Sequence, residues 1–335
     1  MKRLNVVHLL DDMSAGGVTQ ALGVYGRPEL IEFADSRVEQ VDPNQRHAPR
    51  FDADVIVTHF PPRWRALPFV YSLRRRNPRA RLVHVEHSYT RAWEQANVPH
   101  KWRFRAMLRL ALRQYDQVVS VSNGQADWLN AIEAVPSERL RVVAPYSDID
   151  ALLELQRKPR AAGAAIVIGA FGRFAEVKGF ERLIDVFARL DPARFVLRIG
   201  GFGPLEDALE KRAEGLPHVE FVGPVTDRAA FLSACDMLAV PSHWESFGLV
   251  AAEARAAGCP ILVSNVDGLP EQARGRGYVF DFDDTRGVAD TIASVSHSEI
   301  TLMGALARQS VRSLSASRFK AWREIFEAAR PTAAG

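Results

Sequence analysis

The chain has 335 residues, 47% of them hydrophobic and 25% charged, a length that suits two domains and a composition that excludes a wholly disordered chain. No apolar run approaches the roughly 20 residues of a membrane-spanning helix, and the N-terminal segment lacks the long apolar region and cleavage site of a signal peptide. The two cysteines, Cys235 and Cys259, form no CxxC pair, which argues against a disulfide framework and a structural zinc site. We therefore predict a cytoplasmic protein.

The net charge of +3 hides an uneven distribution along the chain. Residues 60–115 contain 13 Lys and Arg against two acidic residues, a net charge of +11. Such a patch indicates an anionic partner, either a phosphate-bearing substrate or a membrane surface. Trp64, Trp102 and Phe104 lie among these charges, a mixture typical of interfacial segments. The alternative is that Phe104 and its apolar neighbours are core residues and that the arginines form a solvated face.

Short apolar segments alternate with longer amphipathic ones along the first half of the chain. These short segments are near-continuously apolar, as parallel strands covered on both faces are. We expect strands at 4–10, 54–60, 81–87, 117–122 and 139–145. Residues 100–114 have helical spacing, with an apolar face that includes Phe104 and Leu108. Basic residues follow at intervals of four along its flank, at Lys101, Arg105, Arg109 and Arg113.

A second series of the same kind starts near residue 165, after residues 156–165, which we interpret as a linker. We expect its strands at 165–171, 194–200, 219–223, 237–242, 260–265 and 277–281, and helices between them at 180–190, 204–216 and 247–257. Repeated strand–helix units favour right-handed crossovers and open sheets. Two such series predict an α/β protein of two Rossmann-like domains with doubly wound parallel sheets, whose intervening cleft is the default ligand site.

Glycine-rich turns follow three of the predicted strands. Gly201-Phe202-Gly203 lacks the third glycine of a dinucleotide fingerprint, and residues 172–179 (GRFAEVKG) are no P-loop, because their lysine precedes the glycine. Both can be plain strand-to-helix turns, although helix N-termini at the carboxyl ends of strands favour anions. After the first strand, Gly16 and Gly17 would let the backbone come close to a bound group.

The densest motif occupies residues 241–271, where Glu245 lies in a loop and Glu253 lies eight residues later within a helix that we expect from about Ser246 to Gly258. Burying Glu253 among Ala, Leu and Val would be costly without partners. Sugar and ribose hydroxyls would supply donors to both carboxylates. The alternative is that Glu245 caps the helix and Glu253 is solvated.

Several ordered motifs resemble the retaining GT-B glycosyltransferases of family 4 (glycosyl transferases group 1). The E-x7-E pattern from Glu245 to Glu253 has PS before it, FGL inside it, and AAG-P and GLPE after it. The other matching motifs are GRFAEVKGFERLIDVF, GGFGPLEDAL, VEFVGPV, VSVSNGQADWL and the glycine pair after the first strand. The resemblance covers most of residues 1–330 and is strongest over 166–272.

This resemblance implies roles for the matching residues in the predicted donor site. Arg173 and Lys178 would hold the donor diphosphate and offset its growing charge as the sugar bond breaks, so that no metal is required. Glu253 would bind the ribose hydroxyls, and Glu245 would meet hydroxyls of the transferred sugar. Gly172, next to Arg173, would also belong to the donor-binding residues.

Backbone groups and the N-terminal domain would complete the site. The N–H groups of Phe247, Gly248 and Leu249 would face sugar and phosphate. Gly16 and Gly17 would let the N-terminal domain approach the reacting centre. His87, at the end of the third predicted strand, matches a polar residue near the transferred sugar, although a lone histidine there is otherwise usually structural.

The resemblance also implies a domain arrangement. It implies a GT-B fold with an acceptor-binding domain at 1–150, a donor-binding domain at 151–314, and a last helix near 315–330 that packs back on the first domain. The chain departs from the family between its domains, where PYSDID (145–150) replaces P-N-G-x-D. Asp281-Phe282-Asp283 looks like the metal-binding DxD of another fold, but capping of the following helix by Asp283 or Asp284 explains it better.

The resulting prediction is a retaining, metal-independent glycosyltransferase. It would move a sugar from a nucleotide-diphosphate sugar, UDP- or GDP-linked, to a glycan or lipid-linked acceptor, such as a precursor of surface polysaccharide or lipopolysaccharide. The basic patch would hold it peripherally at the inner face of the plasma membrane, and no nucleic-acid partner is expected. The alternatives are a nucleotide-sugar epimerase or phosphorylase on the same fold and a nonenzymatic nucleotide-sugar-binding subunit.

Overall fold

A computed structural model describes residues 3–14, 16–157 and 163–330. The chain divides into two compact units, Met1–Ser147 with Leu314–Gly335 and Asp148–Ser313. Sequence analysis placed these boundaries at residues 150 and 314. The predicted linker, 156–165, has its residues 158–162 outside the described part of the chain. Within that described part, no helix combines the length and apolar character needed to traverse a bilayer.

The first unit is built on a six-stranded parallel sheet in the order β2-β1-β3-β4-β5-β6. Its strands are β1 (Leu4–Leu10), β2 (Ala34–Gln40), β3 (Val55–Thr58), β4 (Arg81–Glu86), β5 (Gln117–Ser120) and β6 (Leu140–Val142). Sequence analysis predicted five of the six and missed β2. This edge strand, ADSRVEQ, is largely polar and exposed, which suits an edge that must not pair with another chain. Because it contains no apolar run, a search for apolar segments does not find it.

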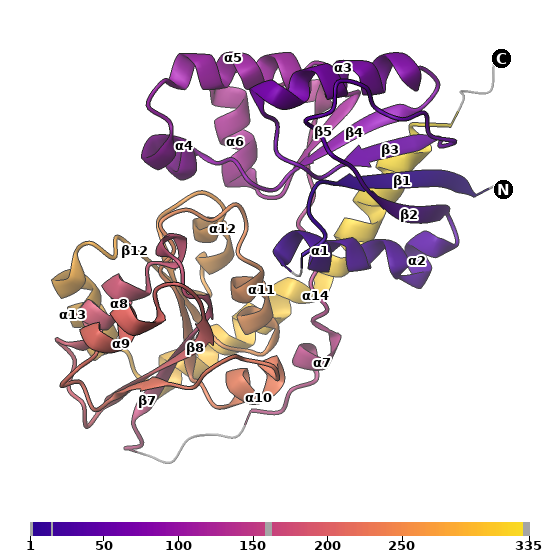
Figure 1. The fold of residues 1–335 in the computed structure, drawn as a ribbon. Helices are drawn as coiled ribbons and strands as arrows, with labels where there is room; N and C mark the ends of the chain where they lie inside the picture. The colour runs from indigo at the N-terminus through magenta and orange to yellow at the C-terminus, as the bar shows by residue number, and fades with distance from the viewer. Residues whose placement is uncertain (1–2, 15, 158–162, 331–335) are drawn as a thin grey trace. The chain divides into compact units, whose positions relative to one another are not determined.

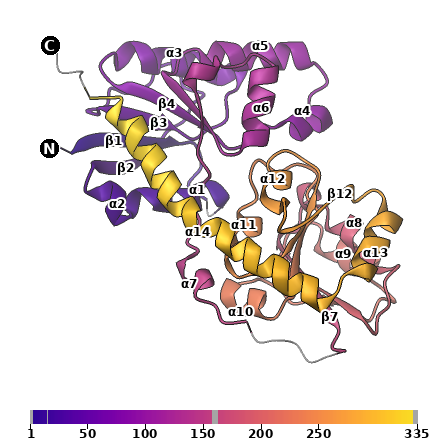
Figure 2. The ribbon, with the colours of Figure 1, turned by 180° about the vertical axis from the view of Figure 1, so that it is seen from behind.

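Helices cover both faces of this sheet (Figures 1 and 2). On one face, α3 (Leu67–Arg76) and α5 (Lys101–Leu112) enclose a core with Val7 and Leu9 of β1. The C-terminal part of α14 (His297–Glu327) lies against the other face, where Arg318 Nε donates to the Ala144 carbonyl at 2.8 Å and Trp322 contacts Tyr25. The other helices of this unit are α1 (Gly17–Ala21), η1 (Leu22–Gly26), α2 (Pro28–Ile31), η2 (Trp64–Ala66), α4 (Arg91–Asn97), α6 (Asn123–Ala131) and η3 (Ser137–Arg139).

The second unit has its own six-stranded parallel sheet, in the order β12-β11-β10-β7-β8-β9. Its strands are β7 (Ile166–Arg173), β8 (Phe195–Phe202), β9 (Val219–Phe221), β10 (Met237–Val240), β11 (Ile261–Ser264) and β12 (Gly277–Phe280). Its shorter helices are α7 (Asp150–Leu153), η4 (Glu176–Lys178), α8 (Phe180–Phe187), α9 (Glu206–Arg212), α10 (Arg228–Ser233), α11 (Leu249–Ala256), α12 (Leu269–Ala273) and α13 (Thr285–Ser294).

The strand order of each sheet reverses direction at one point. In the second unit the first strand, β7, lies between β8 and β10, which is the order of a doubly wound Rossmann sheet. In the first unit the reversal lies between β1 and β3. The predicted α/β fold of two Rossmann-like, doubly wound parallel sheets is therefore confirmed. Ligands of such sheets bind beyond the carboxyl ends of the strands at these reversals.

Candidate active site

The predicted donor residues gather at the strand-order reversal of the second unit. Arg173 is the last residue of β7 and is exposed, and Lys178 ends the short η4 turn that follows. Glu245 lies in the loop after β10, the strand that pairs with β7. The carboxyl ends of these two neighbouring strands therefore carry the two cations and one carboxylate to the same edge of the sheet.

Lys178 and Glu245 form a direct ion pair at this edge. Lys178 Nζ lies 2.6 Å from Glu245 Oε2. Gly179 makes this approach possible, because its φ is 62° and a Cβ there would lie 2.2 Å from the Pro241 carbonyl oxygen. The turn after β7 can therefore pack against the end of β10 only with glycine at position 179. This packing places Lys178 next to the carboxylate of Glu245.

Backbone hydrogen bonds fix the loop that carries Glu245. The Glu245 N–H donates to Asp267 Oδ2 at 3.2 Å, and the Gly268 N–H donates to the Glu245 carbonyl at 3.2 Å. On the other side, the His243 N–H donates to the Val177 carbonyl at 2.9 Å. The backbone of the Glu245 loop is thus held by two neighbouring loops, while Ser242 of its own loop donates to the carboxylate at 3.5 Å.

Helix α11 begins at Leu249, three residues later than the predicted start at Ser246, so this predicted boundary is wrong. The reason is Gly248, whose φ of 88° breaks the helical path and makes it the N-cap, and a Cβ there would lie 2.7 Å from Leu269 Cδ2. Glu245 therefore does not cap α11, and the alternative interpretation of Glu245 as a helix cap is wrong. Phe247 and Gly248 are buried, and the backbone leads from them directly into the first turn of the helix.

Gln272 of α12 holds this helix start in place, a role that sequence analysis missed. Its amide nitrogen donates to the carbonyls of Phe247 and Gly248, the second at 3.2 Å. Its amide oxygen accepts from Arg255 Nη1 at 3.0 Å, which fixes the orientation of the amide. Burial lowers the pKa of Arg255 to about 10, so the guanidinium remains charged at neutral pH. Gln272 follows directly after the GLPE motif, and this position was the only sequence feature that could have indicated its role.

Glu253 is buried in α11 and is paired with an arginine that sequence analysis did not single out. Its side chain is 2% exposed, and its Oε1 lies 2.6 Å from Arg228 Nη1, whose side chain is 41% exposed. Arg228 opens α10, where the preceding Asp227 accepts from the Ala230 N–H as the N-cap. The alternative of a solvated Glu253 is therefore wrong. Arg228 supplies a partner that burial of this carboxylate requires.

The glycine pair of the first unit forms the start of α1. Gly16 is its N-cap and Gly17 its first residue, both exposed, while Ala15 lies outside the described residues. The backbone of Gly16 is extended, and a Cβ added there would meet only the Ser14 carbonyl oxygen, at 4.0 Å. The described residues around Gly16 therefore impose no steric need for glycine at this position.

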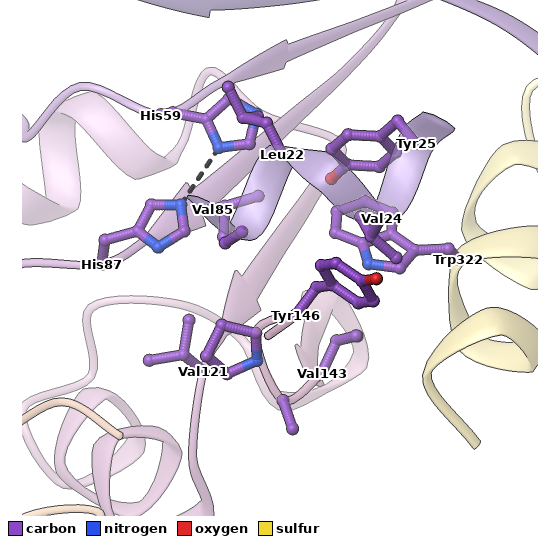
Figure 3. A pocket seen from close by; sticks show the side chains of 13 residues that line it. Leu22, Val24, Tyr25, His59, Val85, His87, Val121, Val143, Tyr146 and Trp322 are labelled. Carbon is purple, nitrogen blue, oxygen red and sulfur yellow. Dashed lines mark hydrogen bonds between the residues drawn. The ribbon is translucent and has the colours of Figure 1, made fainter. Parts of the chain in front are cut away.

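His87 follows β4 and lines a small cavity of about 20 Å³ in the first unit, close to the volume that one water needs (Figure 3). The other lining side chains are largely apolar and include Tyr25, Tyr146 and Trp322. His87 Nε2 lies 3.0 Å from Nδ1 of His59. Burial lowers the pKa of His87 to about 4, with the nearby Glu86 opposing this shift. The imidazole is therefore neutral at physiological pH.

The Asp281-Phe282-Asp283 segment is part of a helix cap and an ion pair. Asp284 is the N-cap of α13 and accepts from the Gly287 N–H at 3.0 Å, and Asp283 lies 3.2 Å from Arg182 Nη1. The capping interpretation is confirmed. Among the residues that the structure describes, no group of three or more His, Cys, Asp or Glu side chains is arranged to hold a metal ion.

Comparisons with known proteins agree with this fold. Residues 165–298 match the family model of glycosyl transferases group 1, and residues 11–145 match that of a glycosyl transferase 4-like domain. The two units are therefore each similar to a glycosyltransferase domain, and their two sheets have the GT-B fold of the solved neighbours.

Two curated relatives cover parts of the chain. A D-inositol 3-phosphate glycosyltransferase of Mycobacterium tuberculosis is 32% identical over 174 residues, which is 48% of this chain and 36% of that protein. An uncharacterized 41.2 kDa protein in the cps region of Klebsiella pneumoniae is 28% identical over 207 residues, 58% of this chain and 56% of that protein. The matched region thus spans between about a third and about a half of the length of these relatives.

Solved structures share the fold over nearly the whole chain. Anabaena Alr3699/HepE in complex with UDP and glucose has a TM-score of 0.75 at 18% identity, covering 97% of this chain and 100% of that one. WaaG, a glycosyltransferase involved in lipopolysaccharide biosynthesis, has a TM-score of 0.69 at 17% identity, covering 96% and 99%. At these identities the likeness concerns the fold.

Proposed function

We propose that this protein is a retaining glycosyltransferase that uses a nucleotide-diphosphate sugar and needs no metal ion. The observation that carries the proposal is the Lys178–Glu245 ion pair at the strand-order reversal, beside the start of α11. A lysine, a carboxylate and a helix N-terminus at one sheet edge suit a ligand that combines phosphates with hydroxyl groups. Solved neighbours in complex with UDP and with UDP-glucose support this class of donor.

The ion pair suggests how the donor would be received. A diphosphate would compete with Glu245 for Lys178, and Arg173, exposed at the end of β7, would supply a second cation. Glu245, released from the lysine, would accept hydrogen bonds from sugar hydroxyls, while Glu253 would do the same for the ribose. The two cations and the first N–H groups of α11 would then offset the charge that develops on the leaving diphosphate.

Retention at the sugar carbon needs no carboxylate nucleophile in this proposal. Attack by the acceptor on the face from which the diphosphate leaves would retain the configuration. The leaving phosphate oxygen, held by Arg173 and Lys178, can take the proton of the acceptor hydroxyl. The bond from sugar to phosphate breaks as the bond from sugar to acceptor oxygen forms, so that charge and protons balance.

A donor panel tests this proposal. The melting temperature of the protein should rise with one class among UDP-, GDP-, ADP- and dTDP-sugars, since a ligand that binds only the folded state stabilises it. With that donor and an acceptor, NMR of the product should show the donor's anomeric configuration, and turnover should persist in excess EDTA. Inversion, or loss of turnover in EDTA with rescue by Mg²⁺, would contradict the mechanism. Donor binding without any turnover would favour a nonenzymatic binding subunit.

We further propose that the acceptor is presented at an anionic membrane surface. Helices α3 and α5 pack side by side (Figure 1). Three large aromatic side chains are exposed on these two helices and on η2, the short turn before α3. Trp102 is 73% exposed, Trp64 46% and Tyr71 40%. Lys101 and Arg103, beside Trp102 in α5, and Arg75 and Arg76, at the end of α3, are exposed as well. We call this set the α3–α5 surface. Aromatic and basic side chains together are what an anionic leaflet attracts.

The predicted basic stripe along α5 is only partly available for this purpose. Arg105 is bound to Glu94 through Nε and Nη2, at 2.7 and 3.0 Å, and Arg109 Nη2 donates to the Ile132 carbonyl at 2.6 Å. These two arginines therefore tie α5 to its neighbours. Met107, Leu108, Ala111 and Leu112 are buried, so the apolar face of this helix is core, and the membrane proposal rests on the exposed residues alone.

A further inference from the structure

Three histidines form a hydrogen-bonded chain in the first unit, and sequence analysis singled out only the last of them. His87 Nε2 lies 3.0 Å from His59 Nδ1, and His59 Nε2 lies 3.1 Å from His8 Nδ1. His8 comes from β1, while His59 and His87 directly follow β3 and β4. Figure 3 shows the facing rings of His59 and His87 at the wall of the cavity. We call His8, His59 and His87 the histidine chain.

The surroundings hold the rings of this chain rigidly. His8 is 0% exposed and stacks on Tyr25 with ring centroids 3.9 Å apart, and His59 is 6% exposed. The rings of His59 and His87 are stacked at 5.3 Å with an angle of 26°. Tyr25 in turn packs against Trp322 of α14. Both inner histidines are therefore buried and packed against aromatic neighbours.

All three imidazoles are neutral at physiological pH. Burial lowers the pKa of His8 to about 3 and that of His87 to about 4. The pKa of His59 lies well below its usual value because of burial and, secondarily, the neighbouring histidines. A neutral imidazole has one N–H donor and one acceptor nitrogen, so each ring of the chain can donate in only one direction.

Two proton arrangements satisfy both hydrogen bonds of the chain. In the first, His8 Nδ1–H donates to His59 and His59 Nδ1–H donates to His87, which leaves His8 Nε2 as a bare acceptor. In the second, every bond is reversed and His8 Nε2 carries a proton. Among the described residues His8 Nε2 is buried without a hydrogen-bond partner. A buried unpaired N–H is rarer in proteins than a buried unpaired acceptor, which favours the first arrangement.

We infer that the histidine chain fixes His87 in the tautomer that carries its proton on Nδ1, so that His87 can donate a hydrogen bond from Nδ1 and cannot accept one there. His8 and His59 are then positioning residues for His87. In this state the lone pair of His87 Nε2 is occupied by His59 and its Nδ1 is protonated. In this state His87 can donate a hydrogen bond to an oxygen atom and does not act as a general base. That a glycosyl donor or acceptor supplies the oxygen rests on the proposed function.

Imidazole ¹⁵N NMR of the full chain tests the tautomer without any enzymatic assay. In the wild-type protein, Nδ1 of His87 and of His59 should show pyrrole-like shifts, and Nε2 of His87, His59 and His8 pyridine-like ones. Exposed His47 serves as the internal reference for a mobile ring, with His47→Gln as the matched control for assignment. A pyrrole-like Nε2 at His87 in the wild-type protein would overturn the inference, whatever the protein is found to catalyse.

Substitutions of His59 separate positioning from packing. His59→Phe keeps a ring in the cavity wall but can neither accept from His8 nor donate to His87, so the Nδ1 and Nε2 shifts of His87 should become averaged. His59→Gln has an amide oxygen to accept and an amide N–H to donate, and it should restore the pyrrole-like Nδ1 of His87. Circular dichroism and a melting curve establish that each variant is folded.

The kinetic effect should follow the same order. If the donor panel has identified a substrate, kcat/KM should fall about three- to tenfold in His59→Phe, the effect expected of one weakened neutral hydrogen bond, and should recover in His59→Gln. Equal loss in both variants would mean that His59 acts through packing alone and would contradict its positioning role. If no donor is turned over, the proposed function fails, while the NMR result still decides the tautomer.

Discussion

Lys178 is the residue whose loss should reveal the chemistry of the site most directly. Its ammonium group is paired with Glu245, and a donor diphosphate would compete with that carboxylate for it. We expect Lys178→Ala and Arg173→Ala each to lower turnover by on the order of 10²–10³, the effect of removing one charge-stabilising donor. Steady-state kinetics measures this, with Lys211→Ala on the exposed side of α9 as the control. Near-normal turnover in both variants would exclude the diphosphate role.

The two glutamates should separate binding from turnover. Glu253→Gln should weaken binding of the free nucleoside diphosphate, because a ribose contact is equally present in the ground and transition states. Glu245→Gln should chiefly lower turnover and should leave that binding unchanged or tighter, since it releases Lys178 from its ion pair. Isothermal calorimetry with the diphosphate compares the two variants. An equal loss of affinity in both would refute this division of roles.

Buried neutral histidines should make the first unit sensitive to acid. The pKa of His8 is about 3 and that of His87 about 4 in the folded chain, each lowered from 6.5 mainly by burial. Below pH 6.5 the unfolded chain therefore binds protons that the folded chain does not. The free energy of unfolding should fall as the pH drops from 6.5 towards 4, by up to about 1.4 kcal/mol per pH unit for each histidine.

Urea unfolding at pH 7.5 and 5.5 measures this dependence. His8→Phe should make the profile flatter, because it removes one of the groups that resist protonation, while His47→Gln on the surface should not change it. Glu86 and His84 are the other ionisable groups that act on His87, so the profile is compared between variants rather than read in absolute terms. The same free energy of unfolding at both pH values would contradict the burial argument.

At the scale of elements, apolar periodicity located the strands that are buried on both faces. It missed β2, whose polar sequence suits the edge of a sheet. It also predicted that α11 begins near Ser246, whereas the helix begins at Leu249, because Gly248 interrupts the helix through its backbone geometry and not through its polarity. Both errors concern features that a hydropathy pattern does not record.

Only those site residues that belong to a recognisable sequence motif could be predicted. Lys178, Glu245 and Glu253 stood in recognisable motifs, whereas their partners come from separate segments: Arg228 is 25 residues from Glu253, and His8 is 51 residues from His59. The histidine pair follows from strand order, which brings β1 beside β3. The Arg228–Glu253 pair joins the two helices that precede and follow β10. No local pattern around Arg228 or His59 indicates the residue that it will meet.

The α3–α5 surface should bind anionic vesicles, and this binding should depend on Trp102, the most exposed of its three aromatic residues. In sedimentation assays the protein should bind vesicles that contain anionic lipid and not zwitterionic ones, and binding should decrease as salt shortens the screening length. Trp102→Ala should weaken binding, because Trp102 is 73% exposed, whereas Trp93→Ala on neighbouring α4, partly buried, controls for the general loss of a tryptophan. Absence of binding at low salt would favour a soluble acceptor.

At the scale of the whole molecule, the C-terminal part of α14 should contribute to the free energy of unfolding of the first unit, although it lies far from that unit's other residues in sequence. Trp322 is 4% exposed and lies 5.1 Å from the ring of Tyr25 and 5.6 Å from that of Phe326. Trp322→Ala should lower the free energy of unfolding of the first unit by about 3–5 kcal/mol through the cavity it leaves. Urea unfolding followed by circular dichroism measures this, with exposed Trp102→Ala as the control. Equal midpoints for Trp322→Ala and the wild type would show that α14 contributes little.

The first unit is assembled from both ends of the chain, Met1–Ser147 and Leu314–Gly335, and this has a consequence during synthesis. A ribosome adding roughly 5–20 residues per second needs on the order of ten seconds or more to pass from one segment to the other. During that interval Tyr25 and Tyr146 lack the cover of Trp322 and Arg318. The nascent chain should therefore attract chaperones until the last helix emerges. Ribosome-stalled chains ending at 313 should consequently be more sensitive to protease in their first 147 residues than chains carried through to 335.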